Sequence, residues 1–372
     1  MLDPVSDGTM ALKLSSDKWL FAVTLVLVLS GIVMVFSASA VLANEKFHTA
    51  SYFLTRQAIW ALLGITGMVF LMHVDYHLYR KPVFVFGGLC LCILLLCAVF
   101  FLDKSHNTHR WFRLGLLSFQ PSELCKIFIA IFFAFFLEKR KGEVNEFRHT
   151  LLPCLVVLAV FIGLIVIEPD LGTAVSIGTV AFLMLFVAGL QYRFVLGSIL
   201  LAIPSLFLLI YSYEYRLRRI MVFLDPWKDP LGAGFQITQS LIALGAGGMA
   251  GVGLMEGKQK LFYLPEPHTD FIFAVIGEER GLIGTVLLVV LFGFFLWRGL
   301  RLSLRAPDPF GRFLGVGLTM MVVCQAFINM SVVMSLLPTK GIPLPFISAG
   351  GSSLLINLLG VGILLNISQH GD

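Results

Sequence analysis

Long apolar runs alternate with short polar segments along almost the whole chain. Each run is roughly 17 to 25 residues long, the length that a helix needs to cross about 30 Å of hydrocarbon. The runs cover residues 19–42, 57–73, 82–102, 121–137, 151–167, 173–190, 194–211, 271–297, 313–337 and 346–368. The pattern predicts an all-α, polytopic integral membrane protein with about ten transmembrane helices, in a single membrane domain over residues 1–372.

One connection, residues 212–270, is much longer than the others and contains a Gly-rich apolar stretch at residues 235–255. Counting this stretch as an eleventh span would move the basic segment between Arg298 and Arg312 to the outer side. Ten spans with cytoplasmic N- and C-termini instead keep most Lys and Arg of the short segments inside. We therefore expect a large extracytoplasmic loop at 212–270 with a re-entrant or interfacial segment.

Composition supports a membrane protein and argues against several other classes. The chain is 58% hydrophobic and 13% charged, with a mean hydropathy of +0.91. The formal charge of +5 comes from Lys and Arg scattered between apolar runs, so we expect anionic lipid and no nucleic acid as partner.

The six cysteines lie in or beside apolar runs without metal-site spacing, which indicates that they are packing residues. No nucleotide-binding motif is present, so a substrate must supply the energy of any reaction.

The polar segment at residues 263–270 ends with His268, Thr269 and Asp270 and leads directly into an apolar span. A carboxylate at the mouth of a helix is partly removed from water but still reachable, as a general base requires. The alternative is that Thr269 or Asp270 caps the helix.

A second polar cluster contains Arg110, Gln120, Glu123 and Lys126. Glu123 and Lys126 are three residues apart on one face of the predicted fourth span. An ionised group within a span costs roughly 2.5 to 3.5 kcal/mol, so this pair should face the bundle interior. It is either a structural ion pair or, through Lys126 and Arg110, a site for an anionic headgroup.

Three further outer segments carry candidate residues. Glu168 and Asp170 lie in a tight turn. They either bind a divalent cation or orient a basic partner, or Asp170 caps the next span. The basic run at residues 215–219 contacts anionic lipid or binds phosphate. Residues 337–353, with Lys340 and Ser352, form either a rigid Pro-rich loop or an anion site at a helix start.

These segments together resemble the SEDS family (shape, elongation, division and sporulation). The matching segments are residues 110–126, 168–173, 223–239, 259–281 and 337–353. The Thr339-Lys340 pair is similar to the cell-division branch rather than to the elongation branch. Ala349, Ser335 and Arg280 depart from the residues that are usual in the family, and none of them replaces a proposed catalytic group.

The resemblance implies an inverting peptidoglycan glycosyltransferase at the outer face of the bacterial cytoplasmic membrane, at the division septum. Lipid II is the implied donor and acceptor, and a class B penicillin-binding protein transpeptidase and other divisome membrane proteins are the implied partners. Asp270 matches the family's essential carboxylate, while Arg110 and Lys126, with or without a divalent cation, would stabilise the departing pyrophosphate. A lipid II flippase and a non-catalytic divisome scaffold are the alternatives.

Overall fold

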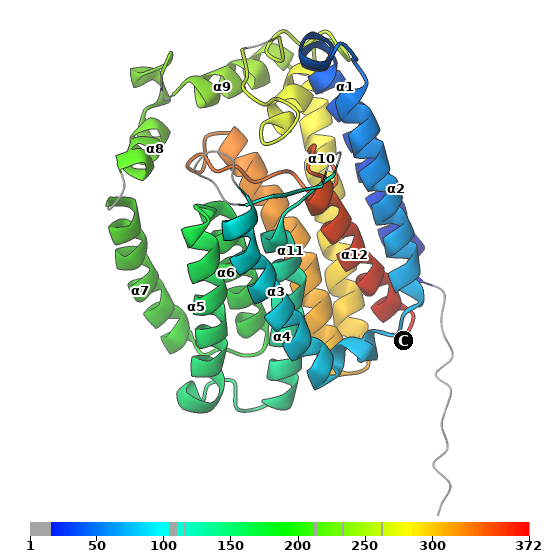
Figure 1. The fold of residues 1–372 in the computed structure, drawn as a ribbon, viewed down its shortest axis with the longest axis vertical. Coiled ribbons are helices and arrows are strands. Elements are labelled where there is room, and N and C mark those ends of the chain that lie inside the picture. The colour runs from blue at the N-terminus through cyan, green and yellow to red at the C-terminus, as the bar shows by residue number, and fades with distance from the viewer. Residues whose placement is uncertain are drawn as a thin grey trace, which may run out of the picture.

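The computed structural model describes residues 16–103, 110–114, 117–211, 214–232, 234–261 and 263–371, which form a bundle of long helices (Figure 1). Parts of two predicted outer segments, residues 104–109 and 212–213, lie outside the described residues. The long helices are α1 (Lys18–Phe47), α2 (Tyr52–His73), α3 (Pro82–Leu102), α4 (Pro121–Lys139), α5 (Leu152–Ile167), α6 (Leu171–Val187), α7 (Tyr192–Tyr211), α10 (Ile272–Arg305), α11 (Pro309–Val333) and α12 (Gly351–Ser368). Each overlaps one predicted span.

Seven helices in the described part of the chain are long and apolar enough to cross a membrane by length and composition. They include α1, α3 and α11, whereas α6 is a shorter apolar helix of 17 residues. α4 carries the charged Glu123, Lys126, Glu138 and Lys139, which lowers its hydropathy. The last predicted span began too early, because residues 338–350 form a loop and α12 begins at Gly351.

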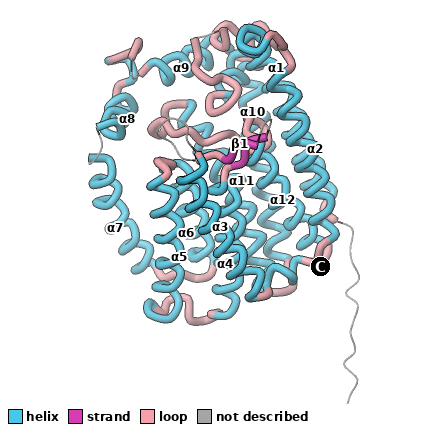
Figure 2. The backbone as a smooth tube through the Cα atoms, viewed as in Figure 1, coloured by secondary structure: helices cyan, strands magenta, loops and turns pink. Residues whose placement is uncertain are grey.

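Short elements connect the long helices. They are η1 (Tyr76–Arg80), η2 (Phe147–Leu151), α8 (Glu214–Leu224), η3 (Pro226–Lys228), α9 (Phe235–Gly247) and the strands β1 (Phe112–Leu114) and β2 (Leu117–Phe119). The two strands pair antiparallel, with Phe112 opposite Phe119 (Figure 2). α9 lies across one end of the bundle rather than along it (Figure 1), so residues 235–255 do not form an eleventh span, as expected.

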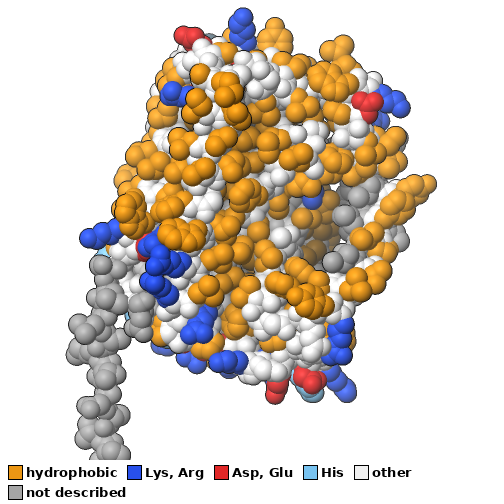
Figure 3. All heavy atoms as spheres, turned by 180° about the vertical axis from the view of Figure 1, so that it is seen from behind, with side chains coloured by type: hydrophobic (Ala, Val, Ile, Leu, Met, Phe, Trp, Pro, Cys, Tyr) orange, Lys and Arg blue, Asp and Glu red, His pale blue; other side chains and the backbone are white. Residues whose placement is uncertain are grey.

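Both described ends of the chain lie at the opposite end of the bundle from α9. The Asp17 backbone N–H donates to Ser368 Oγ at 3.0 Å, and Arg298 forms an ion pair with Asp17. Figure 3 shows a broad hydrophobic belt and Lys and Arg side chains gathered mainly at this lower end. A positively charged end of this kind faces the cytoplasm, so the α9 end faces outward.

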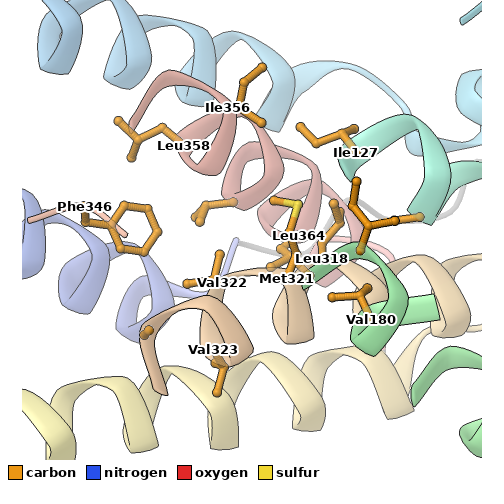
Figure 4. Packing of buried hydrophobic residues seen from close by; sticks show 14 of the residues in the cluster. Ile127, Val180, Leu318, Met321, Val322, Val323, Phe346, Ile356, Leu358 and Leu364 are labelled. Atoms are coloured by element: carbon orange, nitrogen blue, oxygen red, sulfur yellow. The ribbon is translucent and has the colours of Figure 1, made fainter. Parts of the chain in front are cut away.

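The core is centred on α11, which packs against α10, α4, α6 and α12 (Figure 4). Phe310, Leu314, Leu318 and Met321 recur at helical spacing and are at most 1% exposed. Gly315 allows close approach of α10, since a Cβ there would lie 2.4 Å from Ser303 Oγ. α11 therefore provides a fixed support for the polar loops at its outer end.

Candidate active site

Asp270 lies at the outer end of the bundle, immediately before α10. The N-cap of α10 is Phe271, which forms no side-chain capping bond, and the Thr269 hydroxyl donates to the Glu266 carbonyl at 3.0 Å. Neither Thr269 nor Asp270 therefore caps the helix. Among the described residues, no hydrogen bond donor contacts the Asp270 carboxylate. Asp270 Oδ2 lies against Gly341, where an added Cβ would be 2.9 Å away.

The surroundings of Asp270 favour a carboxyl group that titrates near neutral pH. Burial and, after it, the charges of Glu266 and Asp170 raise the pKa of Asp270, which has a net value of about 6. Arg219 and Arg110 oppose this rise. Because a carboxylate with such a pKa is both ionised at pH 7 and able to accept a proton, it suits general-base catalysis.

Side chain to backbone hydrogen bonds hold the Pro-rich loop at residues 338–350 against Asp270. Asn329 Nδ2, from α11, donates to the carbonyls of Asp270 at 2.8 Å and of Ile342 at 2.7 Å. Ser348 Oγ donates to the Thr269 carbonyl at 2.6 Å. The segment is thus a rigid loop, and it forms one wall of the site.

Glu123 and Lys126 form a buried ion pair beneath this loop, with 2.8 Å between Lys126 Nζ and Glu123 Oε2. Lys126 Nζ also donates to Gln325 Oε1 at 2.7 Å, and Gln325 Nε2 donates to the Pro343 carbonyl at 2.9 Å. The predicted ion pair is therefore present and faces the bundle interior. Through Gln325 the ammonium group is connected to the wall of the site.

The turn at residues 168–170 forms a second wall. Asp170 caps α6 by accepting the Thr173 backbone N–H at 3.1 Å, as one alternative predicted, and it also accepts Gln120 Nε2 at 2.9 Å. Arg110 donates through Nε to the Glu168 carbonyl at 2.8 Å and through a terminal nitrogen to the Pro169 carbonyl. The turn therefore brings Arg110, Gln120 and Asp170 together.

Glu168 itself is fully buried, and neither carboxylate oxygen has a hydrogen-bond partner among the described residues. Burial and the neighbouring charge of Asp170 raise the pKa of Glu168, and Arg110 lowers it, which leaves a net value of about 8. The Glu168 side chain is therefore largely neutral at pH 7.

The remaining predicted residues surround these two walls. His268 is buried with its ring 4.2 Å from that of Phe53, and burial lowers its pKa. Burial also lowers the pKa of Lys340. Ser352 is fully buried in the first turn of α12, and its hydroxyl has no partner among the described residues.

Three residues that position or surround the site were not identified individually from the sequence. Gln325 and Asn329 are four residues apart in the apolar α11, a spacing that places both on one face and could have indicated them. Arg219, which the sequence indicated only as part of a basic run, donates to the Thr339 carbonyl at 2.9 Å. Within the described ranges, no group of three His, Cys, Asp or Glu side chains could hold a metal ion.

Comparisons with known proteins give consistent matches along the chain. A family model described as "Cell cycle protein", covering FtsW, RodA and SpoVE, matches residues 17–372. A "Probable peptidoglycan glycosyltransferase FtsW" of Geobacter sp. (strain M18) is 47% identical over 355 residues, covering 95% of this chain and 97% of that protein. The "Stage V sporulation protein E" of Bacillus subtilis (strain 168) is 43% identical over 361 residues, covering 96% and 98%.

Solved structures share the fold. One described as "Structural coordination of polymerization and crosslinking by a peptidoglycan synthase complex" has a TM-score of 0.79 and 29% identity, covering 95% of this chain and 98% of that chain. The rod shape determining protein RodA of Thermus thermophilus has a TM-score of 0.69 and 26% identity, covering 95% and 97%. The chain therefore belongs to the family of cell cycle proteins that includes FtsW, RodA and SpoVE.

Proposed function

We propose that this membrane protein is a peptidoglycan glycosyltransferase that polymerises lipid II into glycan strands at the outer face of the bacterial cytoplasmic membrane. Its relatives at 47% identity carry the name of this activity. The observation that carries the proposal is the Asp270 carboxylate at the outer end of the bundle. It does not cap α10, it is largely buried, and its pKa is about 6.

Asp270 acts as the general base in this proposal. The acceptor's 4-hydroxyl oxygen attacks the anomeric carbon of the donor sugar, and the bond from that carbon to the pyrophosphate oxygen breaks. The electron pair leaves with the lipid pyrophosphate, and the hydroxyl proton passes to the Asp270 carboxylate. Because pyrophosphate leaves without a proton, one carboxylate suffices where a glycosidase uses two, and attack from the opposite face inverts the anomeric carbon.

Cationic groups around Asp270 stabilise the charge that develops on the leaving group. Arg110 is held on the 168–170 turn by two backbone carbonyls, which fixes its guanidinium close enough to influence Asp270. Lys126 contributes from beneath the site through its contact with Gln325. We assign substrate binding to these two residues with Gln120, Glu123, Asp170, His268, Lys340 and Ser352. A divalent cation at this site is part of the proposal, although no step of the reaction described above requires one.

A lipid II flippase is the main alternative, and it requires polar groups through the full depth of the bilayer. The polar network described above instead gathers at the outer end. Below Lys126 lies a cavity of about 10 Å³ whose other lining residues are apolar, namely Ile129, Ile177, Val180 and Met321. This volume is at the lower limit for one water molecule, which favours a one-sided enzyme over a carrier.

The test is polymerisation of lipid II by the purified protein in vesicles, with a transpeptidase partner present. We expect Asp270→Asn to reduce the rate by a factor of about 100 or more. Glu256→Gln, an exposed carboxylate on the same outer loop, is the matched control and should retain the rate. Wild-type protein that moves lipid II across the vesicles without making glycan would refute the polymerase. A normal rate for Asp270→Asn would refute only the assignment of the base.

We further propose that a class B penicillin-binding protein crosslinks the product, that other divisome membrane proteins associate with the chain, and that it acts at the division septum. The similarity to a synthase complex described as coordinating polymerization and crosslinking supports the first part. The FtsW names of its relatives support the others. Fluorescence imaging of a tagged protein in dividing cells tests this, since lateral-wall signal without septal signal would argue for an elongation role.

A further inference from the structure

The first part of α10, which directly follows Asp270, is separated from the rest of the helix. At Gly281 the backbone has φ 65° and ψ −160°, a conformation that ends α-helical geometry. The resulting short segment, residues 272–280, has no side-chain cap at its start. A helix this short is not stable on its own, so tertiary contacts must determine its direction.

A Gly-rich loop after α9 replaces the missing helical hydrogen bonds at this break. The N–H groups of Val252 and Gly253 donate to the carbonyls of Glu278 at 3.0 Å and Glu279 at 3.2 Å. On the other side of the break, Leu282 N–H donates to the Gly248 carbonyl at 2.9 Å. The approach is so close that a Cβ on Gly251 would lie 2.2 Å from the Glu279 carbonyl oxygen.

A buried ion pair fixes the end of the segment that lies away from Asp270. Lys260 Nζ lies 2.6 Å from Glu279 Oε1, and the two side chains are 3% and 0% exposed. Ser37 Oγ, from α1, donates to the Glu279 carboxylate at 2.7 Å. The pair therefore joins the outer loop, α1 and the segment that follows Asp270.

We infer that Lys260 and Glu279 are positioning residues for Asp270, an inference that rests on the proposed function. Glu279 is nine residues after Asp270, which corresponds to roughly 13 Å along a helix. A tilt of a few degrees about the Glu279 end moves Asp270 by about 1 Å, and a displacement of that size costs about 100-fold in rate. A buried ion pair is poor evidence for stability, because apolar replacement is often neutral, so its role here is orientation.

The test compares Lys260→Met, Lys260→Arg and the double variant Lys260→Met/Glu279→Met in the full-length protein. The double variant removes both charges together, so it avoids a buried unpaired carboxylate and should fold. We expect it to lower kcat at least tenfold with little change in KM, and to shift the acid limb of the pH profile. Lys260→Arg keeps the positive charge and should therefore retain most of the rate that Lys260→Met loses. The matched control is Arg80→Met/Glu138→Met, which removes a 2.8 Å ion pair at the cytoplasmic end and should leave kcat unchanged.

Hydrogen–deuterium exchange gives a readout that does not require activity. The amides of residues 272–280 should exchange at least about tenfold faster in the Met/Met variant, while those of α11 stay protected. Unchanged exchange in 272–280, or a wild-type kcat in the Met/Met variant, overturns the positioning role. Faster exchange in a protein whose wild type makes no glycan would instead refute the proposed function and leave the mechanical role of the pair intact.

Discussion

At the scale of single residues, charged neighbours of opposite sign tune the base. Burial raises the pKa of Asp270 most, Glu266 raises it further, Arg219 lowers it, and the resulting value is about 6. Since the base must be ionised to accept a proton, kcat/KM should fall about tenfold per pH unit below pH 6 and level off above it.

Glu266→Gln should move this acid limb to lower pH, and Arg219→Gln should move it to higher pH. Rates of lipid II polymerisation between pH 5 and 8 measure both shifts. Arg193→Gln, an exposed arginine at the cytoplasmic end, is the control and should leave the limb in place. Shifts of the same sign in the Glu266 and Arg219 variants would contradict the electrostatic account.

The same carboxylate should make the folded protein less stable. Its pKa in the folded state, about 6, lies above the ordinary value of about 3.9, so the folded state binds protons more tightly than the unfolded state. The destabilisation is therefore absent below pH 4, grows as pH rises towards 6, and is complete above that. Because the carboxylate keeps some contact with solvent, we expect about 1 to 2 kcal/mol rather than the full effect of the shift.

Asp270→Asn should accordingly melt at a higher temperature than wild type at pH 8 and at the same temperature below pH 4. Thermal unfolding in detergent at the two pH values tests this. If the melting temperature of Asp270→Asn at pH 8 equals that of wild type, the Asp270 carboxylate is well solvated.

At the scale of elements, the break in α10 depends on one residue without a side chain. Gly281→Ala introduces a Cβ 2.4 Å from the Gly251 nitrogen at a positive φ, and should cost about 3 kcal/mol or more. Gly293→Ala, further along the same helix, meets nothing within 4 Å and should be neutral or stabilising by up to about 1 kcal/mol. Thermal unfolding of the two variants provides the comparison, and equal melting temperatures would rule out the break as a structural requirement.

The sequence predicted the long helices well because apolar length alone determines which segments can cross a bilayer. It did not predict the break at Gly281 or the late start of α12, since both depend on hydrogen bonds to residues distant in sequence, such as Gly248 and Thr269. For the site, the sequence identified Asp270 but left a capping role open. Only the geometry of Phe271 and Thr269 excludes that role.

At the scale of the whole molecule, the placement of α9 makes a topological prediction. Leu231 precedes the apolar stretch at residues 235–255, Met255 is its last residue, and the two side chains are 87% and 48% exposed. Because the stretch does not cross the bundle, cysteines introduced at both positions should react with an impermeant thiol reagent added to the outer face. Lys141→Cys should react only from the cytoplasmic face, and the unsubstituted protein provides the background. Labelling of positions 231 and 255 from opposite faces would show that the stretch between them crosses the membrane as an eleventh span.

The contact between Asp17 and Ser368 makes a circular permutation of the chain possible. Residues 17 and 368 are joined by a hydrogen bond of 3.0 Å, so a short linker can connect these two points of the backbone. New termini opened in the exposed turn near residues 140–143, at the same end of the bundle, would leave every outer loop intact. Circular permutation at this place should therefore yield a chain that still inserts and assembles, with α5 as its first helix.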